Sequence, residues 1–325
     1  MIVNQTYTIP LERKPSFDKS PIINIASFSK EPPIIYSIEH ETKYHYSSPI
    51  SHSKHLFRLQ PVHDLSQSIL SFKFFVSSNG AEMTNFSGVF GNHASFLEVK
   101  EKYTDITIKT ESVVAVSQLP YNLDLLHQPR TMPLIWMPWD RAMMNAYLHP
   151  PELAEAELFE LSDYAMSFVK KNHNDAFEVL KDINQTIFND YTYHPGSTNL
   201  FTTPYEVYYQ KKGVCQDFAN LFICLARLLN FPARYRVGYL YTARDYANKI
   251  QGDETHAWVE VYLPYLGWVG FDPTNGCLAE KNHIRVACGR FYRDATPTSG
   301  AIFESEGEVE ESLVTSVKVV QLSPD

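Results

Sequence analysis

Residues 213–222 read GVCQDFANLF, and the apolar run continues as ICLARLL over residues 223–229 before NFP, residues 230–232, ends it. Leucine and phenylalanine side chains fall 3, 4, 7, 10 and 11 residues after Phe218, which predicts a helix with one buried stripe. Cys215 continues that stripe at its amino-terminal end. A cysteine in the first helical turn lies among unpaired backbone N–H groups at the positive end of the helix dipole, and both favour the thiolate. The same N–H groups can hold an oxyanion, so this stretch predicts a nucleophilic helix.

An inert buried thiol is the competing interpretation of Cys215, and this segment taken alone favours it. Cys224, in the middle of the apolar run, fits that interpretation better. The prediction of thiol chemistry therefore depends on histidine and carboxylate partners elsewhere in the chain.

Three strands are predicted after the helix, at residues 234–241, 255–263 and 268–272. If Leu263 pairs with Gly267 across the turn, His256 and Asp272 become diagonal neighbours on one face of the sheet. Such neighbours lie roughly 7–8 Å apart at the backbone, a gap that a carboxylate and an imidazole can bridge. A register shifted by one residue would place the two side chains on opposite faces.

Cys215, His256 and Asp272 together form the Cys-His-Asp arrangement of acyl transfer. Cys215 would attack a carbonyl carbon, His256 would take and return the proton, and Asp272 would fix the imidazole tautomer. A single histidine at a strand end is usually structural, but the three signals together favour a catalytic triad.

Four blocks resemble the signature blocks of bacterial transglutaminase-like proteins, in the same order and with the same spacing. They are GVCQDFA (213–219), PARY with GY (232–235 and 238–239), HAWVEV (256–261) and GWVGFDPTN (267–275). Tyr44, Pro49, residues 59–61 and residues 90–92 are similar to the amino-terminal β domain of that family. The resemblance covers roughly residues 34–300. The chain departs from the family pattern at Asn220, where histidine is usual, and after Arg290, where an acidic residue is common.

The resemblance implies an α+β fold with a papain-like, transglutaminase-like core, in which a nucleophile helix packs on an antiparallel sheet, preceded by an all-β domain. It also implies an oxyanion contributor upstream of the nucleophile, for which Tyr193 is the candidate. Gln216 and Trp258, inside the matched blocks, are further candidates for oxyanion or substrate contacts. No cofactor or metal is expected.

Four segments are predicted along the chain. Residues 1–33 carry scattered prolines and are predicted to form an extended arm, which leads into the β domain, residues 34–120. Residues 121–151 are predicted to connect the β domain to the catalytic domain, residues 152–325. In the last segment, helices are expected at residues 152–172 and 176–188, and alternating apolar residues at 313–319 indicate a final strand.

Composition narrows the functional classes. A formal net charge of −9 with no basic patch argues against nucleic acid as a partner. The amino terminus carries no signal-peptide core and no apolar run is long enough for a membrane span, so we expect a cytoplasmic protein that does not bind membranes. Four cysteines in 325 residues are too few for a disulfide scaffold.

Three functions remain open from the sequence. The first is a cysteine protease or isopeptidase acting on a peptide or protein amide, in which water resolves the acyl-enzyme. The second is a γ-glutamyl transferase, or transglutaminase, that passes the acyl group to an amine. Hydrolysis ranks higher because nothing resembles a calcium loop, whereas animal-type crosslinking enzymes of this superfamily use calcium. The third, a binding module without catalysis, is disfavoured by the intact triad.

Overall fold

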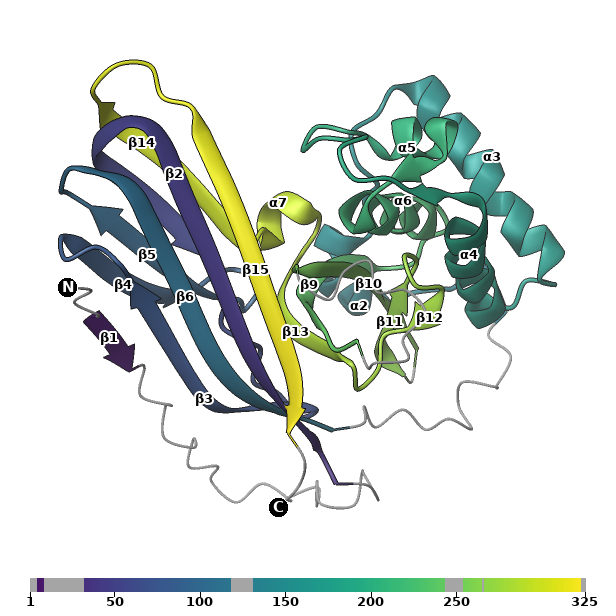
Figure 1. Ribbon diagram of the computed structural model, residues 1–325. Helices are drawn as coiled ribbons and strands as arrows, with labels where there is room; N and C mark the ends of the chain where they lie inside the picture. Colours follow the sequence, from purple (N-terminus) through teal and green to yellow (C-terminus); the bar gives the residue numbers. More distant parts are fainter. Residues whose placement is uncertain (1–4, 9–31, 118–130, 243–253, 265, 323–325) are drawn as a thin grey trace.

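The computed structural model describes residues 5–8, 32–117, 131–242, 254–264 and 266–322, in a β-sheet part and a mixed α and β core (Figure 1). The β part is an eight-stranded antiparallel sheet in the order β1-β3-β6-β2-β5-β4, with β14 and β15 also paired to β2. The strands are β1 (Gln5–Thr8), β2 (Ile34–Phe57), β3 (Gln67–Val76), β4 (Ala81–Ser87), β5 (His93–Val99), β6 (Tyr103–Val116), β14 (Thr298–Ser305) and β15 (Glu311–Leu322).

Strand β2 organises this sheet because it pairs along both edges. Its first half lies between β6 and β15, and its second half lies between β5 and β14. The pairing with β6 shifts between His45 and Ile50. Pro49, which lacks a backbone N–H, falls within this irregularity, where a proline is tolerated in a strand. Strand β2 therefore continues to Phe57 beyond this irregularity.

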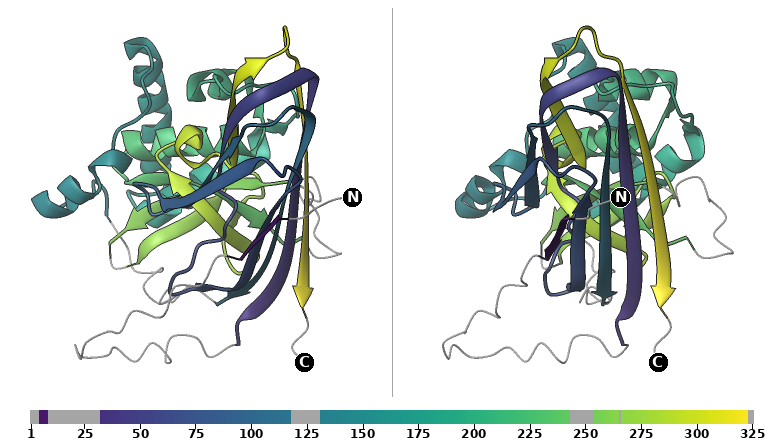
Figure 2. Two further views of the ribbon diagram at one scale, coloured as in Figure 1. Left: turned by 90° about the vertical axis from the view of Figure 1, so that its left-hand side faces the viewer. Right: turned by 60° about the vertical axis from the view of Figure 1, so that its left-hand side comes forward.

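The two last strands belong to the amino-terminal sheet, which corrects the prediction that the catalytic domain runs to residue 325. Both β14 and β15 pair with β2, and β15 lies alongside it over twelve residue pairs (Figure 2). The alternation at residues 313–319 correctly predicted a strand. An alternating pattern does not reveal which strand pairs with which, because every strand offers the same backbone N–H and C=O groups for pairing.

The core consists of helices around a second antiparallel sheet, in the order β12-β11-β10-β9-β13. Its strands are β9 (Ala233–Leu240), β10 (His256–Leu263), β11 (Gly267–Asp272), β12 (Cys277–Leu278) and β13 (His283–Gly289). The helices are α2 (Pro138–Met143), η2 (Asn145–Tyr147), α3 (Glu155–Lys171), α4 (Ala176–Asp190), α5 (Pro204–Gln210), α6 (Cys215–Leu228) and α7 (Tyr292–Ala295), and the short strands β7 (Thr192–Tyr193) and β8 (Lys212–Gly213) form a parallel pair.

Helix α6 lies against one face of this sheet, as the sequence predicted. Ala257, Val259, Val261 and Leu263 of β10 are at most 1% exposed and share one hydrophobic core with the apolar stripe of α6. Helices α3 and α4 match the predicted helices to within three residues at each end. The side chain of Asp175 caps α4 by accepting from two backbone N–H groups of its first turn.

The β-sheet part docks on the core through side chains that bond to the backbone of β13. Asn92 donates to the Cys288 carbonyl at 2.6 Å and accepts from its N–H at 2.8 Å, in the way that a neighbouring strand would. Gln67 bonds likewise to the N–H and carbonyl of Arg285. These contacts satisfy buried backbone groups of β13 from outside its own sheet, and so fix how the two parts meet.

The predicted arm, residues 1–33, lies outside the described residues except for β1 and residues 32–33. The predicted connection, residues 121–151, is described from residue 131 onward and contains α2 and η2. Among the helices of the described part, none combines the length and apolar character needed to cross a bilayer.

Candidate active site

Cys215 is the first residue of α6, and only Val214 separates it from the end of β8. The Asp217 carboxylate accepts the backbone N–H of Val214 at 2.8 Å and the Thr198 hydroxyl at 2.6 Å. A Cβ on Gly213 would lie 2.8 Å from the Cβ of Asp217, so glycine is needed where the chain turns into the helix. These contacts fix the direction in which the Cys215 thiol leaves the backbone.

The backbone N–H groups of Cys215 and Gln216 occupy the first two helical positions. Neither has a hydrogen-bond acceptor among the described residues. Both therefore remain available to an external oxyanion, with the helix dipole adding a favourable field. Cys215 itself is half-buried and lines a cavity of about 290 Å³.

His256 begins β10 and is fully buried. Leu263 pairs with Gly267, and the register continues to Val259 opposite Phe271, which confirms the predicted pairing. It brings the His256 Nε2 atom to 2.7 Å from Oδ2 of Asp272. The other oxygen of Asp272 accepts the backbone N–H groups of Thr274 and Asn275, at 3.0 and 3.2 Å.

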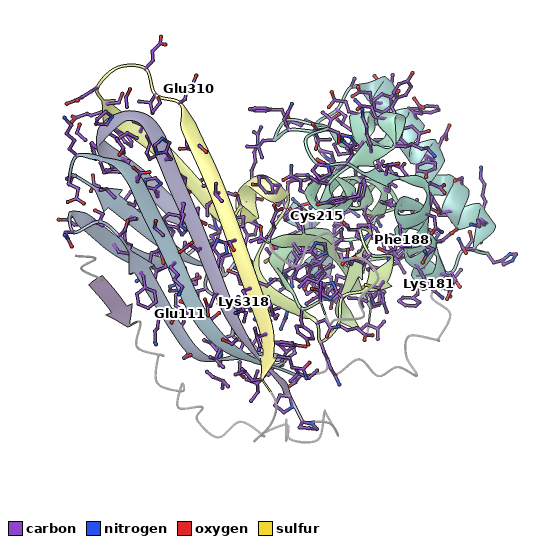
Figure 3. The ribbon with its side chains drawn as sticks, viewed as in Figure 1. Glu111, Lys181, Phe188, Cys215, Glu310 and Lys318 are labelled. Carbon is purple, nitrogen blue, oxygen red and sulfur yellow. The ribbon has the colours of Figure 1, made fainter. Side chains whose placement is uncertain are left out.

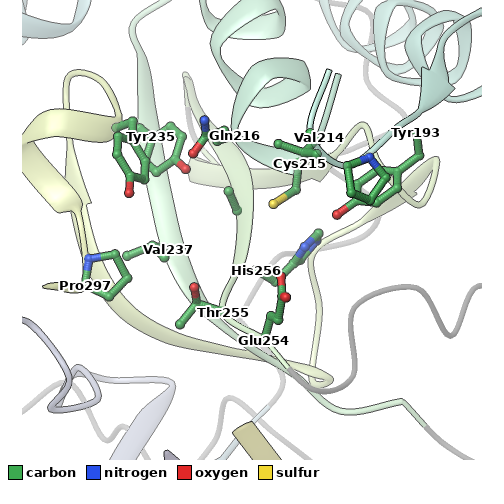
Figure 4. Close-up of a pocket in the computed structure, with 14 residues that line it drawn as sticks. Tyr193, Val214, Cys215, Gln216, Tyr235, Val237, Glu254, Thr255, His256 and Pro297 are labelled. Carbon is green, nitrogen blue, oxygen red and sulfur yellow. The ribbon is translucent and has the colours of Figure 1, made fainter. Parts of the chain in front are cut away.

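This geometry directs the second nitrogen of His256 toward the thiol. The Nδ1 atom has no hydrogen-bond partner among the described residues, and the Cys215 side chain lies beside the imidazole ring in the cavity (Figure 4). Since Asp272 holds the proton on Nε2, Nδ1 is the atom that can exchange a proton with Cys215. The structure thus brings Cys215, His256 and Asp272 together in the order that the chemistry needs.

Burial and charge act in opposite directions on the two titratable partners. Burial by itself lowers the pKa of His256, but the Asp272 carboxylate and, to a smaller extent, Cys215 outweigh it and raise that pKa to about 10. Burial also acts to raise the pKa of Asp272, but His256 and His283 outweigh it and hold that pKa well below its usual range. The charged pair, imidazolium and carboxylate, is therefore the favoured state at neutral pH.

A second histidine, His283, contacts the same carboxylate and was missed by sequence reasoning. Its Nε2 lies 3.0 Å from Oδ2 of Asp272, and the Asn275 amide donates to that oxygen at 2.7 Å. His283 lies on β13, two strands from His256, and no spacing in the sequence reports that strand order. The short turn with Gly267 that fixed the β10–β11 register has no counterpart that would tie β13 to β10.

The ligand atoms of His256, Asp272 and His283 lie within 4.8 Å of one another, close enough to consider a metal ion. Their separations of 2.7 and 3.0 Å are those of hydrogen bonds. A metal-binding histidine normally donates its second ring N–H to an acceptor, yet Nδ1 of His283 has no such partner among the described residues. The residues therefore fit a hydrogen-bonded cluster better than a metal site.

The cavity beside Cys215 contains two of the three other candidate residues. Tyr193, which pairs with Gly213 across β7 and β8, and Gln216 both line it. Trp258 does not: it is 1% exposed and stacks behind His256, with ring centroids 6.0 Å apart. The position of Trp258 does not support the expectation that it contacts substrate, because its side chain is buried behind the His256 ring and does not reach the cavity.

Sequence reasoning did not identify the remaining cavity walls. The lining also includes Tyr235 and Val237 of β9, Glu254 and Thr255 before β10, Tyr292 of α7 and Pro297 just before β14. Cys215 accordingly lies on the side of the core nearer the β-sheet part (Figure 3). These walls come from segments up to about a hundred residues apart, so their meeting depends on the tertiary fold.

A thiol at a helix amino terminus, facing a histidine that a carboxylate holds on an adjacent antiparallel strand, defines the papain-like class of thiol folds. The transglutaminase-like superfamily profile matches residues 162–273, and that of the bacterial transglutaminase-like N-terminal region matches residues 36–115. An uncharacterized protein of Mycobacterium tuberculosis is 33% identical over 311 residues, which span 89% of this chain and 94% of that protein. The chain therefore belongs to the transglutaminase-like superfamily.

The chain is also similar to one solved structure and, over a short stretch, to one enzyme with a named activity. The crystal structure of a protein named "Putative Cysteine Protease from Cytophaga hutchinsonii" superposes with a TM-score of 0.71 at 23% identity, over 91% of this chain and 93% of that one. It shares the whole fold, including the amino-terminal β part. A protein-glutamine gamma-glutamyltransferase of Pseudomonas aeruginosa is 33% identical over 88 residues, which are 26% of this chain and 13% of that protein.

Proposed function

We propose that the protein is a thiol-dependent amide hydrolase, a cysteine protease or isopeptidase, that acts on peptide or protein amides through an acyl-enzyme. The observation that carries this proposal is the direction of His256. Its Nε2 is bonded to the buried Asp272, while its unpartnered Nδ1 faces the Cys215 thiol across the cavity. An imidazole that a carboxylate holds at one nitrogen, with its other nitrogen open to a cavity that a cysteine lines, has the arrangement of a general base beside its nucleophile.

The reaction follows from these positions. The Cys215 thiolate attacks the amide carbon, and the oxyanion is held by the free N–H groups at the start of α6. His256 gives its Nδ1 proton to the departing amine as the C–N bond breaks. Water then attacks the thioester, His256 takes a proton from that water, and the carboxylic acid leaves as the thiolate re-forms.

Transfer of the acyl group to an amine is the second candidate. Glu254 supplies the only carboxylate among the cavity-lining residues of the described chain, and it would attract a cationic amine. The same first half-reaction would serve, with the amine replacing water in the second. The product distinguishes the two: a free acid, or a new amide.

The proposal is tested by alkylating the purified protein with sub-stoichiometric iodoacetamide from about pH 5 to about pH 9 and locating the modified cysteine by mass spectrometry. We expect Cys215 to react selectively, with an apparent pKa well below the ordinary value of about 8.5, and His256→Ala to abolish that selectivity. Cys277, which is also half-buried, is the internal control. Burial raises the pKa of the Cys224 thiol to about 12, so Cys224 should stay unmodified.

Equal reactivity of Cys215 and Cys277 would contradict the proposal. The acceptor is then identified with a glutamine- and lysine-containing peptide library plus a labelled primary amine. Cleavage or deamidation that Cys215→Ala abolishes supports hydrolysis. Incorporation of the labelled amine at the expense of the free acid supports the transferase instead.

A further inference from the structure

Two histidines share one carboxylate oxygen in the core. His256 and His283 approach Oδ2 of Asp272 through their Nε2 atoms, at 2.7 and 3.0 Å. The side chains of all three residues are at most 4% exposed. A catalytic triad needs only one histidine, so the triad itself does not explain the hydrogen bond between His283 and Asp272.

His283 reaches the site because β9 carries a glycine at the crossing point. Gly238 pairs with His256 on one side of β9 and with Arg285 of β13 on the other. A Cβ at this position would lie 2.0 Å from the Ile284 carbonyl oxygen and 2.7 Å from Cη2 of Trp258. Without that Cβ, His283 can pack edge-to-face on Trp258, with ring centroids 5.1 Å apart at 73°.

His283 thereby contacts both groups that hold the His256 ring. It bonds to Asp272, which accepts from Nε2 of His256, and it supports Trp258, which stacks on the ring at an interplanar angle of 27°. The Asn275 amide adds a third donor to the same carboxylate oxygen. Three donors on one oxygen leave the carboxylate a single favourable orientation, and the imidazole that it holds inherits that orientation.

We propose that His283 is a positioning residue, whose Nε2 donor orients Asp272 so that Nδ1 of His256 is kept facing Cys215. This inference rests on the proposed function, since it assumes that the thiolate and imidazolium form a working pair. His283 does not line the cavity, so its effect reaches the substrate only through His256.

The titratable groups that face His256 come from four elements. They are Cys215 of α6, Asp272 of β11, His283 of β13, and Glu254 at the cavity rim before β10. Of these, Cys215 and Asp272 raise the pKa of His256. Loss of the His283 bond would let the Asp272 carboxylate and the imidazole reorient, and a misdirected imidazolium stabilises the thiolate less. The apparent pKa of the Cys215 thiol would then rise.

The test compares two substitutions in the full-length protein, with the iodoacetamide reactivity of Cys215 against pH as the readout. His283→Phe keeps an aromatic ring against Trp258 but removes the donor, and His283→Gln keeps an amide donor but removes the ring. We expect His283→Phe to raise the apparent pKa of Cys215 by about one unit, which lowers the alkylation rate near pH 6 about tenfold. His283→Gln should stay within about threefold of the wild type.

His55→Phe is the matched control. His55 is a buried histidine of the β-sheet part that also has an unpartnered Nδ1 and a bonded Nε2. This substitution should affect thermal stability while leaving the pH profile of Cys215 unchanged.

The outcomes separate the two proposals. If wild-type Cys215 titrates like an ordinary thiol, the proposed function fails. If the wild type shows the depressed pKa but His283→Phe has the same profile, or His283→Gln is impaired as much as His283→Phe, the positioning role is wrong. Should His283→Phe not fold, NMR of the wild type decides: the His283 Nε2 proton must be protected from solvent exchange and must shift on alkylation of Cys215, and an unprotected or unshifted proton overturns the role.

Discussion

Two carboxylates are buried in the same sheet, and they are satisfied in different ways. Glu260 of β10 accepts from Arg234 Nε and Arg236 Nη2, each at 2.7 Å. Asp272 of β11 accepts from His256, His283 and an amide. Neighbouring cations outweigh burial in both cases and hold both pKa values well below the usual range.

The difference lies in what the partners can do with their protons. An arginine stays protonated at any physiological pH, and Arg236 is held charged even more firmly by Glu260. Arg234 also lies 4.1 Å over the Trp268 ring, so that its guanidinium packs on an aromatic face. His256 can release its proton and faces a cavity that contains a thiol. The Glu260 cluster therefore holds the sheet together, and the Asp272 cluster can transfer a proton.

The largest expected effect is on the rate constant for the acylation of Cys215. Asp272→Asn offers His256 an amide in place of a carboxylate, which favours the wrong tautomer and removes the charge that stabilises the imidazolium. The turnover measured with a substrate found by the library screen should fall about 10⁴-fold.

Asp272→Asn should lower the free energy of unfolding less than Glu260→Gln does, because His256 can lose its charge when the carboxylate is lost. Urea denaturation of Asp272→Asn checks this. A loss of stability without a loss of rate would reverse the roles that we assign to the two clusters.

The second-largest expected effect is a loss of folding stability in Glu260→Gln. Arg236 is buried and Arg234 is partly buried, and an arginine does not lose its charge, so removal of their counter-ion should lower the free energy of unfolding by about 3–5 kcal/mol. Urea denaturation at pH 7 measures this difference. Cys215 of the folded variant should keep its wild-type alkylation profile. A changed profile would show that the two clusters are coupled through the sheet.

The smallest effect is a pH dependence of stability that only the Asp272 cluster should show. Because the pKa of His256 is raised from about 6.5 to about 10, its stabilising contribution is complete below about pH 6.5 and is lost as the pH rises through about 10. The free energy of unfolding should therefore fall by on the order of 1–3 kcal/mol between pH 6 and pH 10 from this group.

Urea denaturation of the wild type and His256→Ala across that range isolates the contribution. The fall should be smaller in His256→Ala and fully retained in Glu260→Gln, because the arginines do not titrate there. An identical fall in the wild type and His256→Ala would mean that the His256 pair is not charged at neutral pH.

Local signals in the sequence were enough for several parts of this molecule. The 3-and-4 spacing after Phe218 predicted α6, and a short turn with Gly267 predicted the register that places His256 beside Asp272. Trp258, a candidate for contact with substrate, lies on the same face of the sheet as His256 but stacks behind its ring. A period-2 pattern reports which face a residue is on and not what covers that face.

The sequence by itself determined the nucleophile helix, the antiparallel strands that carry His256 and Asp272, and the superfamily to which the chain belongs. These features depend on residues close together along the chain, where turn chemistry and periodicity act directly. Only the tertiary structure decided that β14 and β15 complete the amino-terminal sheet, that His283 shares the carboxylate of Asp272, and which side chains enclose the cavity. Backbone pairing groups are the same at every position, so the choice of partner between distant segments is made by the packing of the whole chain.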